Sequence, residues 1–277
     1  MSIWSAILLG IVQGLTDFLP VSSSGHMSII YNLFNISSAA DGNKLFDALL
    51  HIGTISSVLI VYRGEIAEMF YELLSFADVG PLAGQPKNRH FAAREFIMIF
   101  AATLPLLLVL PVRARLEMLY YRNIFVGVAV FLTGCVLYTA DRMPAGKKNE
   151  RNMTILDAII IGICQCTAAI PGLSRSGIAI TGGIAVGLRK DYAVKFAFLL
   201  SVPASLGVCI FKIADAARAG VDWSLLPAYL LGMVFSLLSG ILAINILKNI
   251  GEKGKFGGFA YYCWVVGVLG IILSMIF

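Results

Sequence analysis

Long apolar runs alternate with short polar segments along the whole chain. A membrane-spanning helix needs about 20 mostly apolar residues. Six segments meet or approach that length: 46–62, 95–111, 120–140, 190–211, 226–247 and 256–277. Residues 64–77 instead carry glutamates along one face and apolar side chains elsewhere, which predicts an amphipathic helix at the membrane surface. The pattern predicts an all-α polytopic membrane protein with about six full spans.

Two further stretches begin apolar, break at a polar segment and turn apolar again. Residues 3–36 break at Pro20 and the serines that follow it, and residues 154–188 break at Pro171 and Gly172. Non-helical backbone at membrane depth is tolerated only where protein buries it or water reaches it. We therefore expect two re-entrant helix hairpins whose tips meet inside the protein.

The two broken stretches match each other at a constant offset of 152 residues. The matching pairs are Gly10 and Gly162, Gln13 and Gln165, Ser22 and Ser174, Ser24 and Ser176, and Gly25 and Gly177. Chance accounts for one match but not for a set in one register, which indicates an internal repeat. We place the first repeat at residues 1–140, a basic cytoplasmic linker at 141–153 and the second repeat at 154–277.

Loop charges predict the orientation. Placing residues 63–94, 141–153, 189–195 and 248–255 in the cytoplasm puts 14 Lys and Arg inside and 6 outside, which is the bias that cytoplasmic loops carry. Three spans then separate the two hairpins. Because that number is odd, the repeats would be inverted, as in transporters whose sites lie at the repeat interface.

Composition and charge exclude several classes of protein. Hydrophobic residues make up 58% of the chain and charged residues 13%, whereas a soluble domain carries about 25% charged residues. The chain is therefore not an ordinary soluble enzyme. Its basic residues are scattered in short loops, so we expect membrane lipids and no nucleic acid among its partners.

Few ionisable side chains fall inside the apolar segments, and such residues are functional suspects because lipid solvates charge poorly. They are Asp17, His26, Asp47, His51 and Arg175. Arg175 stands between two serines at a Pro–Gly break. A planar donor fork, hydroxyls and the N–H groups of a helix start suit a phosphate or another oxyanion.

The first break supplies the remaining groups for phosphate chemistry. His26 lies three residues after Ser23, so one helical turn predicts that the imidazole reaches that hydroxyl, as in an activated nucleophile. Asp17 could hold a divalent cation or orient His26. Together these groups describe phosphoryl transfer or phosphate-ester hydrolysis.

Structural interpretations stay open beside this one. Serine-rich breaks also satisfy backbone groups, and Asp17 could merely neutralise Arg175. Asp47 could pair with His51, four residues further along one helical face. Aromatic residues near the segment ends, Tyr262 among them, are typical of an interfacial belt.

Two segments resemble the motifs of the undecaprenyl-pyrophosphate phosphatase family, the bacitracin-resistance phosphatases. They are QGLTDFLPVSSSGH from Gln13 to His26 and PGLSRSG from Pro171 to Gly177. The resemblance covers nearly the whole chain in length, segment order and motif spacing. It implies an inner-membrane enzyme that hydrolyses undecaprenyl pyrophosphate to undecaprenyl phosphate and phosphate. It further implies a role in recycling the lipid carrier of cell-wall synthesis, a site that opens outward, and a divalent cation, magnesium or calcium.

The resemblance assigns roles position by position. Catalytic roles fall on Asp17, Ser23, His26 and Arg175, with Asp17 also the metal ligand. We expect substrate contacts from Gln13, Ser22, Ser24, Ser174, Ser176 and Thr181. Asp17 stands where glutamate is usual and Ala179 where threonine is usual, so we expect activity with altered metal dependence.

Three points stay open at the level of sequence. The nucleophile is Ser23, His26 or water, and assembly as a homodimer is undecided. A transporter or flippase for a polyprenyl phosphate lipid is the alternative function, since inverted repeats with broken helices are a transport architecture. The type 2 phosphatidic acid phosphatases need a second histidine downstream, but His51 and His90 lie in the wrong surroundings for that role.

Overall fold

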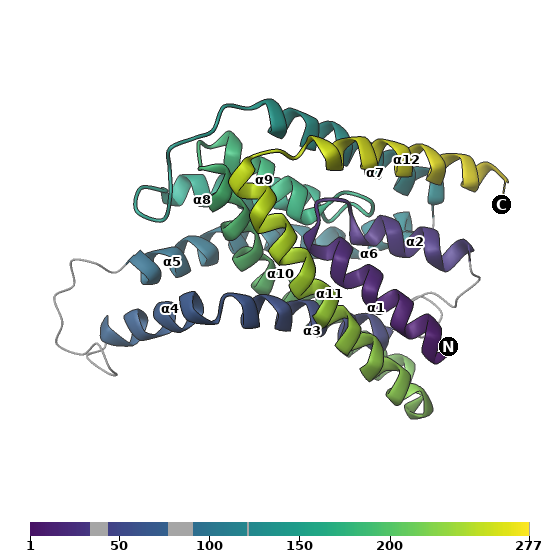
Figure 1. The fold of residues 1–277 in the computed structure, drawn as a ribbon. Coiled ribbons are helices and arrows are strands. Elements are labelled where there is room, and N and C mark those ends of the chain that lie inside the picture. The colour runs from purple at the N-terminus through teal and green to yellow at the C-terminus, as the bar shows by residue number, and fades with distance from the viewer. Residues whose placement is uncertain (34–43, 77–90, 121, 277) are drawn as a thin grey trace.

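The computed structural model describes residues 1–33, 44–76, 91–120 and 122–276 (Figure 1); His90 lies outside these ranges. Within them the regular elements are helices, and Lys148 and Leu188 form an isolated parallel bridge rather than a strand. Six helical segments are long and apolar enough to cross a membrane: Lys44–Val61, Phe91–Leu119, Ile124–Arg142, Lys190–Ala219, Trp223–Lys253 and Gly257–Met275. The predicted all-α architecture with about six spans is confirmed.

The spanning segments correspond to seven labelled α-helices and two 3-10 helices. They are α3 (Lys44–Val61), α5 (Phe91–Thr103), η3 (Leu104–Val112), α6 (Arg113–Leu119), α7 (Asn123–Arg142), α10 (Lys190–Ala219), η4 (Trp223–Leu225), α11 (Leu226–Lys253) and α12 (Gly257–Ile276). The second segment leaves α geometry after Thr103 because Pro105 and Pro111 have no N–H to donate. The expected amphipathic helix is α4 (Arg63–Phe76).

Each broken stretch consists of two helices and a short break. The first contains α1 (Ile3–Phe18) and α2 (Ser23–Leu33), and the second contains α8 (Ile155–Thr167) and α9 (Arg175–Ala185). Both breaks fall where the prolines and serines predicted them.

Glycines let the broken stretches pack closely against full spans. α1 packs on α11, and α8 packs on α5. A Cβ atom on Gly10 would collide with the backbone carbonyl of Gly232, and one on Gly162 would collide with that of Ala102. These two glycines are a matching pair of the repeat, and each lies at a helix crossing that a larger residue would force apart.

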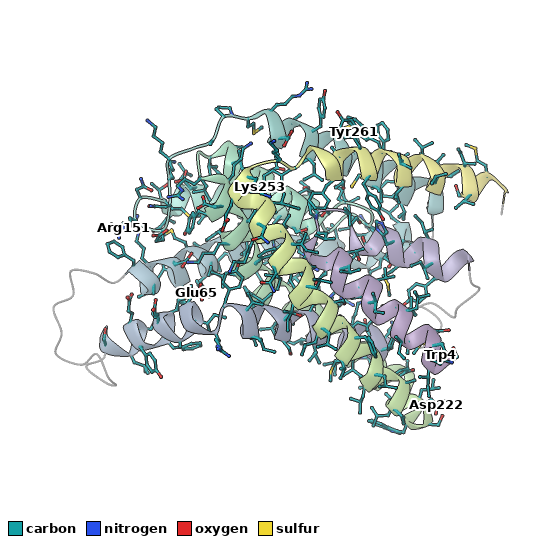
Figure 2. All side chains as sticks on the ribbon, in the orientation of Figure 1. Trp4, Glu65, Arg151, Asp222, Lys253 and Tyr261 are labelled. Atoms are coloured by element: carbon teal, nitrogen blue, oxygen red, sulfur yellow. The ribbon has the colours of Figure 1, made fainter. Side chains whose placement is uncertain are left out.

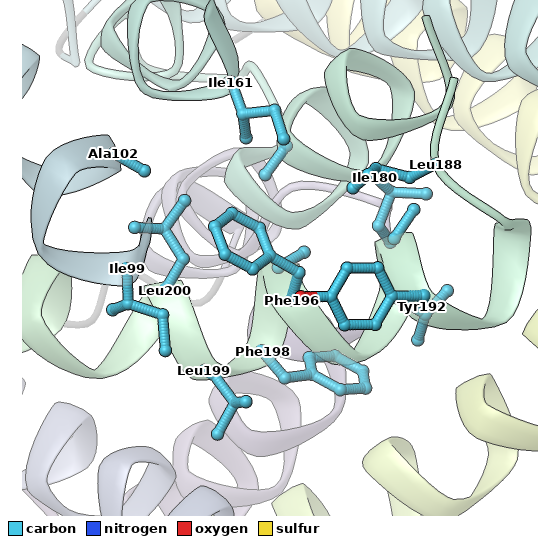
Figure 3. Close-up of a cluster of buried hydrophobic side chains, with 14 of the residues drawn as sticks. Ile99, Ala102, Ile161, Ile180, Leu188, Tyr192, Phe196, Phe198, Leu199 and Leu200 are labelled. Carbon is cyan, nitrogen blue, oxygen red and sulfur yellow. The ribbon is translucent and has the colours of Figure 1, made fainter. Parts of the chain in front are cut away.

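The main buried cluster joins the second broken stretch to α10. Figure 3 shows Ile161 of α8, Ile180 of α9 and Phe196 of α10 together in this cluster, and all three side chains are almost fully buried. A closely packed apolar cluster therefore holds the second broken stretch against α10.

The basic segments gather at one end of the molecule. Backbone hydrogen bonds join two of these segments. The Lys148 N–H donates to the Gly187 carbonyl, and the Arg189 N–H donates to the Lys148 carbonyl. Lys190 donates to the Gly254 carbonyl at 3.0 Å. At the other end, Asp215 pairs with Arg113 and Lys44. Figure 2 shows Arg151 toward one end of the molecule and Trp4 and Asp222 toward the other.

Candidate active site

The tips of the two broken stretches touch. The backbone N–H of Gly172 donates to Ser24 Oγ at 3.0 Å, and Ser176 Oγ donates to the Leu19 carbonyl at 3.4 Å. These bonds join residues about 150 positions apart in the sequence. The prediction that the tips meet inside the protein is confirmed.

The two tips repeat one pattern of hydrogen bonds. Ser22 Oγ accepts from the backbone N–H three residues further on at 3.2 Å and lies 3.2 Å from the hydroxyl two residues on. Ser174 makes the same two contacts, also at 3.2 Å each. Both serines thus cap a helix N-terminus, and the sequence repeat is also a repeat of local structure.

Two helix N-termini therefore point into the same region. α2 begins at Ser23 and α9 begins at Arg175. Unpaired N–H groups and the helix dipole make each N-terminus attractive to anions. The guanidinium group of Arg175 adds a full positive charge, so the meeting of the tips is suited to a phosphate group.

A short chain of polar contacts links Ser23, Asp17 and Arg175. Ser23 Oγ donates to Asp17 Oδ1 at 3.2 Å, and Arg175 Nη2 lies 3.5 Å from the same oxygen. Arg175 Nη1 also donates to Ser205 Oγ on α10 at 2.9 Å. The Asp17 side chain is only 6% exposed, so its charge depends on these partners.

The expected bond between His26 and Ser23 is not formed. His26 Nδ1 lies 2.8 Å from the Ser22 carbonyl oxygen, and Nε2 lies 2.8 Å from the Tyr262 hydroxyl. Both ring nitrogens are therefore taken by other partners. The acceptor for the Ser23 proton in this arrangement is Asp17, not the imidazole.

The other serines of the tips bond to backbone or to one another. Ser22, Ser24, Ser174 and Ser176 all do so, as the structural interpretation of the breaks predicts. Ser23 differs from them because its hydroxyl donates to a carboxylate. The arrangement therefore favours Ser23 as the reactive hydroxyl.

Asp47 and His51 do not pair with each other, so that alternative is wrong. Asp47 accepts from the Tyr31 hydroxyl at 3.0 Å and from Lys212 at 2.8 Å. His51 Nδ1 instead lies 3.3 Å from Gln13 Nε2. Gln13 is buried, and its side chain contacts a residue of α3.

Thr181 lies on the second turn of α9, and its hydroxyl donates to the Gly177 carbonyl at 2.7 Å. Sequence reasoning did not find three residues near the site. Ser201 and Ser205 face the site from α10. Thr133 accepts a hydrogen bond from the Ser174 N–H at 3.0 Å. Ser201 and Ser205 stand four residues apart in an apolar span. A spacing of four places both hydroxyls on the same face of the helix, and this was the one feature of the sequence that could have pointed to them.

A small cavity opens beside the charged pair. Its volume is about 10 Å³, enough for about one water molecule. The lining residues are Asp17, Phe18, Arg175, Ser176, Ala197, Phe198 and Ser201. A diphosphate group is larger than this space, so its entry requires movement of the surrounding side chains or tips.

The donor atoms fit a divalent cation only in part. Among the described residues, no three His, Cys, Asp or Glu side chains gather to hold a metal ion. Asp17 supplies one carboxylate, and its Oδ1 atom already faces Ser23 and Arg175. Magnesium is often held by one or two carboxylates together with substrate phosphates. The described side chains therefore supply one carboxylate ligand, and a cation there would need phosphate oxygens as further ligands.

Comparison with known proteins identifies the family. The chain matches the family described as bacitracin resistance protein BacA over residues 6–269. It is 37% identical to the undecaprenyl-diphosphatase of Alkaliphilus metalliredigens over 278 residues, covering 100% of both chains. It is 36% identical to the enzyme of that name from Carboxydothermus hydrogenoformans, covering 99% of this chain and 98% of that one. The protein is a member of the bacitracin resistance protein BacA family.

Proposed function

We propose that this protein is an integral membrane phosphatase that hydrolyses undecaprenyl diphosphate to undecaprenyl phosphate and phosphate. One observation carries the proposal: Ser23 donates to Asp17, and Asp17 pairs with Arg175, where two helix N-termini converge. The relatives named undecaprenyl-diphosphatase support the substrate. Neither line of support favours the transporter or flippase.

In the proposed mechanism, Arg175 binds the terminal phosphate. Its remaining N–H groups and the N-terminus of α9 neutralise the negative charge that builds up on the phosphate oxygens. Asp17 accepts the proton of Ser23, as an aspartate accepts the substrate hydroxyl proton in protein kinases. Ser23 Oγ then forms a bond to the terminal phosphorus, and the bridging P–O bond breaks to release undecaprenyl phosphate.

Water completes the reaction. It attacks the phosphorus of the phosphoserine, the bond to Ser23 Oγ breaks, and inorganic phosphate leaves. Asp17 returns its proton to Ser23 Oγ and is again ionised, while the attacking water leaves one proton on the phosphate and releases the other to solvent. His26 contributes by holding the carbonyl of Ser22, the residue next to the nucleophile.

Asp17 is the residue that would hold a divalent cation, magnesium or calcium, when the substrate is bound. Such a cation supplies positive charge against the diphosphate and draws it toward the carboxylate. The contact between Asp17 and Arg175 at 3.5 Å is longer than a strong hydrogen bond. The Nη2 end of Arg175 can therefore turn toward the substrate while Nη1 keeps its bond to Ser205.

We also propose that the two broken stretches are re-entrant hairpins of an inverted repeat, in the units 1–140 and 154–277. α1 and α2 lie toward the end that carries the N-terminus, and α8 and α9 lie toward the opposite end (Figure 1). The contacts across the repeat support this, because α3 packs on α10 and α7 packs on α12. Each of these pairs joins one helix from each unit.

The orientation follows from the loop charges. We propose that residues 141–153 and the other basic segments face the cytoplasm and that the protein lies in the inner membrane. Ser23 and His26 belong to the stretch that begins at the opposite end of the molecule. The active site would therefore open to the extracytoplasmic side.

Phosphate release from undecaprenyl diphosphate by the purified protein in detergent tests the function. A phosphatase releases inorganic phosphate although detergent offers no compartments, whereas a pure transporter releases none. Ser23→Ala should abolish release, and Ser24→Ala, which removes a neighbouring hydroxyl that bonds to backbone, should retain much more activity. Equal activity in both variants would exclude Ser23 as the nucleophile.

A further inference from the structure

α12 runs beside the first break, although it comes from the far end of the chain. Cys263 Sγ lies 3.7 Å from the Pro20 carbonyl oxygen. Two turns further on, α12 passes α2, where a Cβ atom on Gly270 would lie 3.3 Å from Ile29 Cδ1. The helix is therefore placed to contact the residues that surround Ser23.

Tyr262 of α12 makes the most specific of these contacts. Its hydroxyl lies 2.8 Å from His26 Nε2, and the two rings are parallel to within 1°, with centroids 5.6 Å apart. The other ring nitrogen faces a carbonyl oxygen, which can only accept, so Nδ1 carries the hydrogen. In a neutral imidazole Nε2 is then the acceptor, and the Tyr262 hydroxyl donates to it.

His26 in turn holds an unusual piece of backbone. Ser22 has φ = 72°, the one positive φ outside glycine among the described residues. A non-glycine residue is strained in this left-handed region and stays there only when its surroundings hold it. The Ser22 carbonyl accepts from both the backbone N–H and the ring Nδ1 of His26, at 3.2 Å and 2.8 Å. Ser23 follows directly, so this turn sets the direction of its hydroxyl.

We infer that Tyr262 is a positioning residue for the hydrolysis and acts through His26. The inference rests on the proposed function. The Tyr262 hydroxyl fixes the imidazole in the orientation in which Nδ1 holds the strained Ser22 carbonyl. That carbonyl keeps Ser23 Oγ directed at Asp17. Without the phenol hydroxyl the ring can rotate, and Ser23 spends less time in the reactive orientation.

The contact can be removed without disturbing the fold. Tyr262 is 46% exposed, so Tyr262→Phe opens no internal cavity and strips the hydroxyl alone. Tyr261, one residue earlier on α12 and 58% exposed, packs on Trp264 and provides a matched control. We expect Tyr262→Phe to lower kcat for phosphate release about fivefold to tenfold, the effect of one lost hydrogen bond. KM should stay within about twofold, because Tyr262 does not bind substrate, and Tyr261→Phe should match the wild type.

Combining Tyr262→Phe with a substitution at His26 tests whether Tyr262 acts through His26. In His26→Asn the amide can still donate to the Ser22 carbonyl, but no atom reaches the Tyr262 hydroxyl. Tyr262→Phe should therefore cause no further loss in the His26→Asn background, which is the signature of coupled residues in a double-mutant cycle. The same proportional loss in both backgrounds would overturn the inference, and so would wild-type kcat in Tyr262→Phe.

A chemical measurement separates this inference from the proposed function. Diethyl pyrocarbonate modifies an unprotonated imidazole nitrogen, and the extent at each histidine can be read by peptide mass spectrometry. His26 should react several-fold faster in Tyr262→Phe than in the wild type or Tyr261→Phe, because Nε2 loses its partner. Equal rates would overturn the inference even in an active enzyme. If His26 is modified faster in Tyr262→Phe but the wild-type protein releases no phosphate, the contact between Tyr262 and His26 is supported and the proposed phosphatase function is excluded.

Discussion

Replacing Asp17 by asparagine tests the interaction at the centre of the site. Asparagine keeps the size of the side chain and an oxygen that can still accept from Ser23. It removes the negative charge that lies 3.5 Å from Arg175, and an amide oxygen is a far weaker proton acceptor than a carboxylate. The substitution therefore changes both the chemistry at Ser23 and the environment of a partly buried cation.

The structure sets the size of each effect. Removing one partner of a buried ion pair lowers the free energy of unfolding by about 3–5 kcal/mol. Arg175 is 23% exposed and keeps its bond to Ser205, so we expect the low end of that range, about 3 kcal/mol. Loss of a positioned proton acceptor lowers turnover by about 100-fold to 10,000-fold. Activity should therefore fall much further than the folded fraction of the protein.

Two measurements separate these effects. Phosphate release in detergent gives kcat, and thermal unfolding of the same preparation gives stability. Ser23→Ala serves as the matched control, because it should lose activity while the charged pair, and with it the stability, remains. Asp17→Glu should retain most activity. A folded Asp17→Asn variant with more than about a tenth of wild-type kcat would refute the role of Asp17 as proton acceptor.

Four further predictions follow from the same geometry. Arg175→Lys keeps the charge but loses the donor fork, so kcat should fall at least about tenfold; wild-type kcat would make Arg175 structural. A chelator should lower phosphate release, and added magnesium or calcium should restore it; unchanged release would exclude a cation at Asp17. A single cysteine at Lys147 should react with an impermeant thiol reagent only from the cytoplasmic side, and one at Glu117 only from outside; the reverse pattern would invert the topology. Gly10→Ala should lower the free energy of unfolding by about 1–3 kcal/mol through overpacking against Gly232, whereas Gly207→Ala, with open space around it, should not.

Sequence reasoning located the helices because their signals are local. An apolar run of spanning length is sufficient to predict a span, and the part of the chain that the structure describes contains six such helices. The breaks were also local, since Pro20 and Pro171 are followed by residues that favour turns and caps. Burial of the tips followed from the rule that lipid does not tolerate open backbone, so their meeting was predictable as well.

The partners of the site residues were less predictable because they come from distant parts of the chain. Ser205 reaches Arg175 from α10, and Tyr262 reaches His26 across 236 positions. Tyr262 was assigned to the interfacial belt, since its position near a segment end gives no hint of this contact. Only the packing of α12 along the first break brings it there.

The error over His26 has a local cause. Spacing of three residues places two side chains on one face in the middle of a helix, but Ser23 is the first residue of α2. The left-handed turn at Ser22 directs the Ser23 hydroxyl back toward α1, where it meets Asp17. Helical side chains lean toward the N-terminus, so the His26 ring reaches the Ser22 carbonyl one turn earlier.

In the proposed mechanism, matched positions of the two tips supply the two halves of the phosphate site. Ser23 and Arg175 stand at the same offset of 152 residues as the matched serines on either side of them, and each is the first residue of its helix. The capping serines keep the same hydrogen bonds in both units. What differs is the residue between them: a hydroxyl that can attack phosphorus in one unit and a cation that can bind phosphate in the other. Because the tips meet, these two matched positions converge on Asp17, so the proposed mechanism needs residues from both tips.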